Sequence, residues 1–195
     1  MREPTTTSDA PPLAIGLELG EHAMRLTATF AIQMVEHQWQ ARLAAPPTPE
    51  VALRAIDELI ARVLRDAEVP SARMAHVAIG LCLWDGADAE HGIVRRMRYV
   101  AGWEDYPLAE QLALRWGGPV RLAAAPEAAA LAEARLGAGS GWRSVLYVLL
   151  ARSVWSALVV DGQLVGGGHG LAGQLAHWRV RTNGPRCSCG AYGHL

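Results

Sequence analysis

The chain has 195 residues, a formal net charge of −1, and 51% hydrophobic against 19% charged residues. These values exclude a disordered chain and give no overall attraction to nucleic acid or to an anionic membrane surface. No stretch approaches the roughly 18 apolar residues of a membrane span, the N-terminus lacks the apolar core of a secretory signal, and three cysteines are too few for a disulfide framework. We therefore expect a cytoplasmic globular protein with no membrane segment.

The first half of the chain predicts a strand-rich segment followed by a helix. Residues 1–12 are polar and rich in proline, which is typical of a flexible tail. Three strands are expected over residues 13–20, 24–32 and 34–40. Gly20 opens the first turn, and Thr48 followed by Pro49 is typical of a helix start. The residues after Pro49 place six apolar side chains on one helical face: Leu53, Ile56, Leu59, Ile60, Val63 and Leu64.

The second half predicts strands that alternate with helices. Strands are expected over residues 75–83, 119–123, 145–151 and 155–165. Helices are expected over residues 106–116 and 125–137. Asp105 is suited to cap the first of these helices and Gly117 to end it. Asp161 and Gly162 predict a tight turn within the last strand segment. This order of elements predicts a mixed α/β architecture.

The stretch HWRVRTNGPRCSCGAYGHL, residues 177–195, holds two of the three cysteines and two of the seven histidines. Cys187 and Cys189 are two positions apart, so both sulfur atoms can reach one zinc ion at about 2.3 Å. Gly190 and Gly193 allow the backbone to wrap back toward such an ion. Two other interpretations remain open at this point: a reduced cysteine pair beside unrelated histidines, and a redox pair.

Several stretches resemble the ROK family of repressors, uncharacterised reading frames and sugar kinases. The strongest is GGGHGLAGQLAHWRVRTNGPRCSCGAYGH, which corresponds to the family signature G-x-x-G-x-x-G-E-x-G-H followed by C-x-C-G-x-x-G-C. AIGLELG, GIVRRMRYVAGWEDYPL, EAAALAEARLGAG and WSALVVDGQLVGG follow in the family's order. The resemblance implies an α/β, actin-like ATPase (ribonuclease H-like) fold. It also implies a complete first lobe over residues 13–122 and the beginning of a second lobe over 123–195.

The resemblance further implies a structural zinc ion. In the family, the signature histidine and three cysteines hold this ion. The corresponding residues here are His177, Cys187, Cys189 and, in place of the third cysteine, His194. Zinc accepts imidazole or thiolate, so the resulting set of two cysteines and two histidines is still suited to it.

The positions that the resemblance assigns to nucleotide binding and catalysis depart from the family's pattern. The first phosphate loop keeps Gly20 but has Glu18 in place of an aspartate, and the second, around Ser153, has lost its glycines. The catalytic aspartate corresponds to Ala125, and Glu127 is the nearest acid. We therefore expect Gly20 and Ser153 to form only a degenerate nucleotide site, and we expect no catalytic residue and no phosphorylation activity.

The sugar contacts implied by the resemblance are weakened as well. The signature glutamate is Gln174, which can still donate and accept hydrogen bonds. Gln174, His177 and Glu127 therefore remain as candidate residues of a weak sugar site.

These departures favour a non-catalytic ROK-like protein of the sugar-responsive transcriptional regulator type, which binds a sugar or a protein partner. ROK repressors carry a winged helix-turn-helix before the actin-like part, and the residues before the first expected strand are too few for one. We expect no DNA-binding domain in this chain, a length shorter at both ends than that of a ROK repressor, and a homo-oligomer, most simply a dimer. A glucokinase-like ROK sugar kinase and a purely structural assembly module remain as alternatives.

Overall fold

The computed structural model describes residues 13–19, 23–30, 37–42, 47–66, 77–84, 86–97, 100–150, 154–167, 172, 175–187 and 189–195. The predicted tail over residues 1–12 and the predicted turn at Gly20 lie outside these residues. The chain forms two compact units, Met1–Ala123 and Ala124–Leu195. Each unit has its own sheet and its own hydrophobic core.

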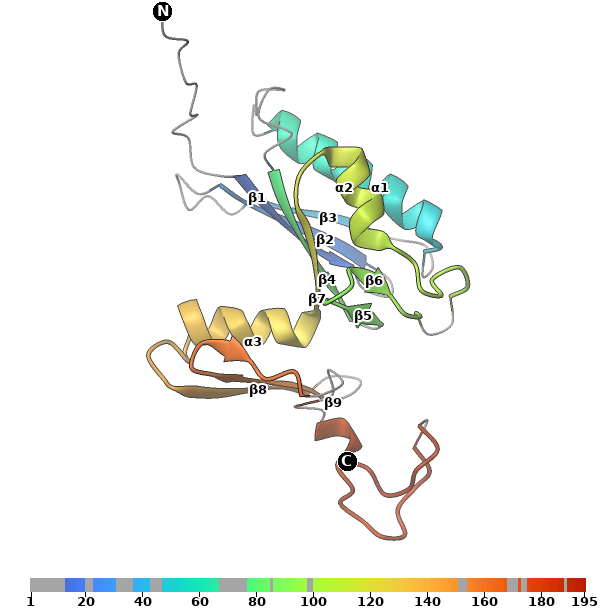
Figure 1. The fold of residues 1–195 in the computed structure, drawn as a ribbon, viewed down its shortest axis with the longest axis vertical. Coiled ribbons are helices and arrows are strands. Elements are labelled where there is room, and N and C mark those ends of the chain that lie inside the picture. Colours follow the sequence, from blue (N-terminus) through green and yellow to red (C-terminus); the bar gives the residue numbers. More distant parts are fainter. Residues whose placement is uncertain are drawn as a thin grey trace, which may run out of the picture. The chain divides into compact units, whose positions relative to one another are not determined.

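The first unit is built on a five-stranded mixed sheet (Figure 1). Its strands are β1 (Leu13–Leu19), β2 (Ala23–Phe30), β3 (His37–Arg42), β4 (Val77–Leu83) and β7 (Val120–Ala124). They lie in the order β3-β2-β1-β4-β7. β1 pairs antiparallel with β2 and parallel with β4. A parallel pair needs a crossover connection, and helix α1 (Pro49–Asp66) lies within it. The three strands expected near the N-terminus are confirmed, with modest shifts of their ends.

The core of this unit lies between the sheet and two helices, α1 and α2 (Leu108–Trp116), which cover the same face (Figure 1). All six apolar residues that the sequence predicts on one face of α1 are buried. Along β1, Ile15, Leu17 and Leu19 are buried and alternate with more exposed residues, as a strand with one covered face requires. Burial of these apolar side chains is the main stabilising contribution.

Trp103 is the largest side chain that is fully buried in this core. Its indole N–H donates a hydrogen bond to the carbonyl oxygen of Pro47 at 2.8 Å. Its ring also meets Tyr106 edge to face, with centroids 5.5 Å apart. The side chain therefore combines apolar packing with a satisfied polar atom, which a buried tryptophan needs.

The structure shows that the predicted cap of the second helix was wrong. α2 begins at Leu108, and Pro107 is at the N-cap position. Asp105 instead has a φ of 49°, and its carboxylate accepts a hydrogen bond from Arg95 at 2.9 Å. The predicted end is confirmed, because Gly117 follows the helix with a φ of 72°.

Arg95 follows a small hairpin that the sequence did not predict, formed by β5 (Ala87–Asp88) and β6 (Ile93–Val94). The Asp88 carboxylate accepts hydrogen bonds from the backbone N–H of His91 at 3.1 Å and from Arg95 at 2.9 Å. These contacts, chiefly the one from the backbone of His91, lower the pKa of Asp88 to about 2. The charged form of Asp88 thus closes the hairpin turn.

The second unit contains a three-stranded sheet with one helix packed on it (Figure 1). Its elements are α3 (Ala125–Leu136), β8 (Ser144–Leu150), β9 (Val154–Val160), β10 (Gln163–Leu164) and the short 3₁₀ helix η2 (Leu175–His177). The strand order is β10-β9-β8. Ala130 of α3 and Ala157 and Val159 of β9 form the centre of its core.

The tight turn predicted at Asp161 and Gly162 is confirmed. The two residues have φ values of 51° and 76°, as a type I′ turn requires at both central positions. The turn divides the single expected strand segment over 155–165 into β9 and β10. In the described parts of both units, no helix combines the length and the apolar character needed to cross a membrane.

Candidate metal centre

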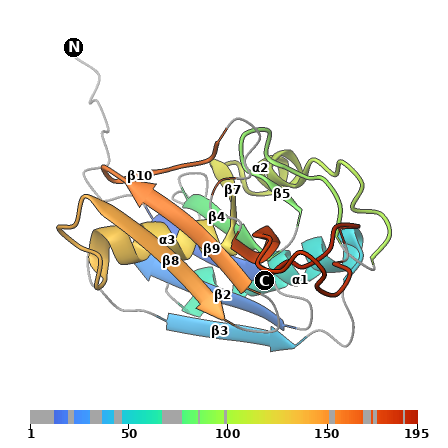
Figure 2. The same ribbon diagram turned by 90° about the horizontal axis from the view of Figure 1, so that it is seen from below.

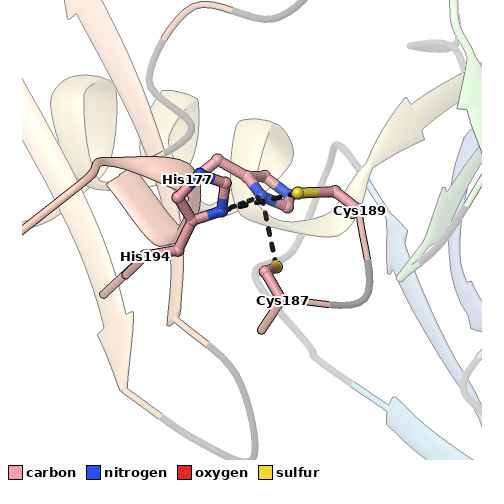
Figure 3. Close-up of side chains that lie close together, drawn as sticks. All are labelled: His177, Cys187, Cys189 and His194. Carbon is pink, nitrogen blue, oxygen red and sulfur yellow. Dashed lines mark hydrogen bonds between the residues drawn. The ribbon is translucent and has the colours of Figure 1, made fainter. Parts of the chain in front are cut away.

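Four side chains near the end of the second unit converge on one point (Figure 3). His177, Cys187, Cys189 and His194 each offer one ligand atom, and these four atoms all lie within 4.8 Å of one another. The structure therefore brings together the four residues that the sequence predicts as metal ligands. No second cluster of this kind is found among the residues that the structure describes.

Three of the separations between these atoms are close to the edges of a tetrahedron around a zinc ion. The Nδ1 atoms of His177 and His194 are 3.2 Å apart. His177 Nδ1 lies 3.8 Å from Cys187 Sγ, and His194 Nδ1 lies 3.5 Å from Cys189 Sγ. Tetrahedral bonds of about 2.0 Å to nitrogen and about 2.3 Å to sulfur give edges of about 3.3 Å between nitrogens and about 3.6 Å between nitrogen and sulfur. The four donors thus lie close enough together to be candidate ligands of a single ion.

The first of the four residues, His177, is fixed to the sheet of the second unit. It ends η2, whose first residue, Leu175, donates its backbone N–H to Ser156 Oγ on β9 at 3.1 Å. The backbone N–H of Trp178 donates to the Leu175 carbonyl at 2.9 Å and closes the turn. His177 therefore extends from a position set by β9.

Cys187 and Cys189 lie in a tight turn. The Gly190 N–H donates to the Cys187 carbonyl at 3.0 Å, and the Cys187 N–H donates to the Ala191 carbonyl at 2.8 Å. Gly190 has a φ of 96°, a conformation that residues with a Cβ atom rarely adopt. The turn brings both sulfur atoms to the same side, toward the histidines (Figure 3).

Gly193 brings the fourth residue, His194, back to His177. It has a φ of 74°, and a Cβ atom there would overlap the carbonyl group of Arg181. The Gly193 carbonyl accepts hydrogen bonds from the N–H groups of Val180 and Arg181 at 2.8 and 3.0 Å. Only glycine allows this close approach of the two chain segments.

The segment that carries the four donors has almost no hydrophobic core. Within the described stretches 175–187 and 189–195, no apolar side chain is buried. Four large apolar side chains there are at least half exposed: Trp178, Val180, Tyr192 and Leu195. The order of this segment therefore rests mainly on backbone hydrogen bonds, and a shared ligand would add to it, as in small zinc-binding domains.

The contacts have a second interpretation without metal. Cys82, Cys187 and Cys189 are all thiols with no disulfide between them. Without an ion, the two Nδ1 atoms at 3.2 Å can form a hydrogen bond only if one of them carries a proton. A metal ion engages all four donors at once, so it accounts for the convergence more simply than a redox pair or unrelated histidines.

Outside this cluster, Glu18 is held in a structural contact. Its carboxylate accepts a hydrogen bond from the indole N–H of Trp84 at 2.7 Å. Cys82 lies beside Glu18 in the paired strands, and burial, followed by the negative charge of Glu18, raises the pKa of the Cys82 thiol. The sequence did not predict Trp84 as a partner of Glu18, because the two residues are 66 positions apart.

The start of α3 carries no carboxylate at its first positions. Ala124 is the N-cap and makes no side-chain capping bond, and Ala125 and Pro126 follow it. Glu127 is the acid of the first turn and is half-buried. Gly20, Ser153 and Gln174, the other predicted nucleotide and sugar positions, lie outside the described residues.

A model of the ROK family matches residues 14–195. The chain belongs to the ROK family. The resemblance drawn from the signature stretch is thereby confirmed.

Curated relatives within the ROK family are of two kinds. The chain is 34% identical to a glucokinase of Thermotoga maritima over 146 residues, which is 75% of this chain and 44% of the glucokinase. It is 35% identical to the DNA-binding transcriptional repressor Mlc of Escherichia coli over 108 residues, which is 55% of this chain and 27% of the repressor. The chain therefore spans less than half the length of each of these two ROK proteins.

Solved ROK structures confirm the fold. The ROK hexokinase of Thermus thermophilus matches with a TM-score of 0.77 and 29% identity, over 93% of this chain and 58% of that chain. A ROK family transcriptional regulator, described as a homologue of the E. coli MLC protein, matches with a TM-score of 0.76 and 21% identity, over 93% of this chain and 45% of that chain. The α/β fold of the actin-like ATPase type, with mixed sheets, is thus established for this ROK chain.

Proposed function

We propose that this chain is a non-catalytic ROK protein of the sugar-responsive regulator type, which binds a sugar or a protein partner and carries a structural zinc ion. Its 35% identity to the repressor Mlc supports the regulator type. Two features of the second unit support this proposal: the start of α3 argues against catalysis, and the cluster of two cysteines and two histidines argues for the metal.

The residues at the start of α3 are the main support for the proposal that the chain is not a catalyst. Ala124 and Ala125 stand where the family resemblance places an Asn-Asp pair, and neither side chain can take a proton from a sugar hydroxyl. A general base contributes a factor of roughly 10² to 10⁴ in rate. Glu127 lies two residues further on, after Pro126, so its carboxylate leaves the helix from a different position.

The zinc part rests on the distances within the cluster and on the lack of a core around it. His177, Cys187, Cys189 and His194 would hold the ion through two nitrogen and two sulfur atoms. Such an ion cross-links the loop and supplies no reaction chemistry, because four protein ligands leave no open coordination position.

The first test is a sugar phosphorylation assay with ATP and Mg²⁺. We expect no sugar-dependent consumption of ATP with any pentose, hexose or N-acetylhexosamine, because Ala125 stands where the resemblance places the catalytic aspartate. The glucokinase of Thermotoga maritima serves as the positive control under the same conditions. Measurable turnover that is lost in a Glu127→Ala variant would overturn the proposal.

Sugar phosphorylation that depends on Glu127 would instead establish the second candidate, a glucokinase-like ROK sugar kinase that depends on ATP. The 34% identity to the Thermotoga glucokinase over 75% of this chain favours this candidate. It requires Glu127 to replace the aspartate of the family and requires phosphates to bind near Glu18, whose carboxylate already accepts a hydrogen bond from Trp84.

A second test measures sugar binding by thermal unfolding. At least one sugar is expected to raise the unfolding temperature. A sugar present at about 100 times its dissociation constant stabilises the protein by about 2.7 kcal/mol. A Gln174→Ala variant is expected to lose the shift, because the resemblance assigns Gln174 to the sugar. If no sugar shifts the wild-type transition, the sugar-binding part fails and an assembly module is favoured instead.

A further inference from the structure

Cys187 and Cys189 provide both sulfur atoms of the candidate metal centre. The resemblance to the ROK signature places a third cysteine where this chain has His194. Cys82 is the remaining cysteine of the sequence, and it lies on β4 of the first unit. A reaction that joins the two sulfur atoms of the pair would therefore remove every sulfur ligand from the centre and leave only two imidazole nitrogens.

The two sulfur atoms are placed to form a disulfide with each other. Two Cα atoms that are two residues apart lie at most about 7 Å from one another even in an extended chain. The hydrogen bond from the Gly190 N–H to the Cys187 carbonyl at 3.0 Å folds the chain into a turn and shortens this span. A disulfide needs Cα atoms about 4.4 to 6.8 Å apart. The sulfur atoms lie no more than 4.8 Å apart, so a local movement of the turn would join them.

Zinc binding would keep both sulfur atoms of the pair in their reactive form. A cysteine binds zinc as the thiolate, and the thiolate, rather than the thiol, attacks an oxidant. Cys82 differs, because burial, followed by the negative charge of Glu18, raises the pKa of its thiol and keeps it protonated. An oxidant should therefore react with the pair before it reacts with Cys82.

We propose that hydrogen peroxide oxidises Cys187 and Cys189 to a disulfide and thereby releases the zinc ion, which makes this pair a reversible redox site. The inference rests on the zinc ion of the proposed function. In the first step, one thiolate attacks a peroxide oxygen, the O–O bond breaks, hydroxide leaves, and the sulfur becomes a sulfenic acid. In the second step, the other thiolate attacks this sulfur, the S–S bond forms, the S–O bond breaks, and a second hydroxide leaves.

The reaction balances without a further reactant. Two protons from the solvent convert the two hydroxides to water. The two sulfur atoms together lose two electrons, the peroxide gains them, and zinc leaves as the unchanged divalent ion. A structural zinc site has four ligands, so His177 and His194 alone would not retain it.

Release of the ion would open the segment from His177 to Leu195. No apolar side chain is buried in the described part of this segment, so hydrogen bonds alone would hold it. Before the segment, the hydrogen bond from the Leu175 N–H to Ser156 Oγ ties η2 to β9, which is the middle strand of the order β10-β9-β8 (Figure 2). Oxidation would thus open the metal segment and leave the sheet intact.

His194 makes the reaction complete within the segment. After oxidation no thiol remains between His177 and Leu195, so none there can attack the new disulfide or react with another molecule. A cysteine at position 194 would leave one reactive thiol behind. A dithiol returns both sulfur atoms of the pair to thiols, and the centre can bind zinc again.

The test treats the zinc-loaded full chain, purified in the absence of oxygen, with about a tenfold molar excess of hydrogen peroxide. An indicator dye measures the zinc released, and alkylation followed by peptide mass spectrometry identifies the state of each cysteine. We expect one zinc ion released for every two thiols lost, and a peptide containing Cys187 and Cys189 that is lighter by two hydrogen atoms. A dithiol with added zinc should restore both thiols and the bound ion.

Trypsin reports the opening of the segment, because it cleaves after Arg179, Arg181 and Arg186. Cleavage at these sites should be at least about tenfold faster in the oxidised chain than in the zinc-loaded chain. Cys82→Ser is the matched control, since Cys82 lies outside the cluster. This variant should release zinc and become sensitive to trypsin as the wild type does.

Zinc that stays bound while both thiols are oxidised would overturn the inference, as would zinc release without a disulfide between Cys187 and Cys189. Either result leaves the zinc part of the proposed function intact, because the chain carries zinc at the start of the experiment. A reduced chain that binds no zinc would overturn both the zinc part of the proposed function and this inference.

Discussion

A Cys189→Ser variant is expected to lose the metal and, with it, the ordered structure of the segment from His177 to Leu195. Loss of a residue that merely orients a ligand weakens metal binding by roughly 10- to 100-fold, so loss of a ligand itself should weaken it by more than about 100-fold. The segment has no buried apolar side chain in its described part, so little else would keep it folded.

Elemental analysis of the wild type should give about one zinc per chain, and the variant should give almost none. Limited proteolysis should then cut the variant, or the wild type treated with a chelator, within this segment. Cys82→Ser is the matched control, because Cys82 lies in β4 of the first unit, outside the cluster. Wild-type protein that is free of metal and yet resists proteolysis here would show that the cluster is held by hydrogen bonds alone.

The second large effect is expected in the core of the first unit. Replacement of Trp103 by alanine should lower the free energy of unfolding by about 3–5 kcal/mol. Trp103 is fully buried, and its removal would leave a cavity, an unpaired Pro47 carbonyl and a lost edge-to-face contact with Tyr106. Urea unfolding followed by circular dichroism measures the change.

Trp142→Ala provides the control, since Trp142 is 74% exposed and its loss should change stability by no more than about 0.5 kcal/mol. Trp103→Phe keeps most of the ring volume but removes the indole N–H, so it separates packing from the hydrogen bond. Equal effects of Trp103→Ala and Trp142→Ala would contradict the placement of Trp103 at the centre of this core.

The sequence predicted those elements in which only one face packs against the core, because their apolar residues then repeat at regular intervals. The six apolar residues of α1 repeat with the period of a helix, and each of them is buried. The turn at Asp161 and Gly162 was also predictable, because few residue pairs accept two positive φ values in succession. In these cases, neighbouring residues determine the structure.

The features that the sequence did not reveal depend on contacts between distant residues. Asp105 had the side chain of a helix cap, but Arg95 binds its carboxylate, and α2 begins three residues later. The hydrogen bond between Glu18 and Trp84 joins strands that become neighbours only in the folded sheet. Nothing local in the sequence marks either contact.

The four residues of the candidate metal centre were assigned from the resemblance to the ROK signature, and their closeness in the sequence explains why the structure brings them together. His177 and Cys187 are ten positions apart, and Cys189 and His194 are five apart. A local turn can bring such residues together without help from the rest of the fold. The predicted sugar and nucleotide positions are spread along the chain instead, and three of them, Gly20, Ser153 and Gln174, lie outside the described residues.

The order of the four donors along the chain has a consequence for synthesis on the ribosome. The polypeptide emerges from its N-terminus, so α3, β8 and β9 leave the exit tunnel before any of the donors. His177 emerges first and His194 last, 17 residues later. During that interval a nascent chain exposes two thiols without the full ligand set. The proposed zinc ion could bind all four ligands only after His194 has emerged, so the supply of zinc would set how long those thiols stay open to oxidation.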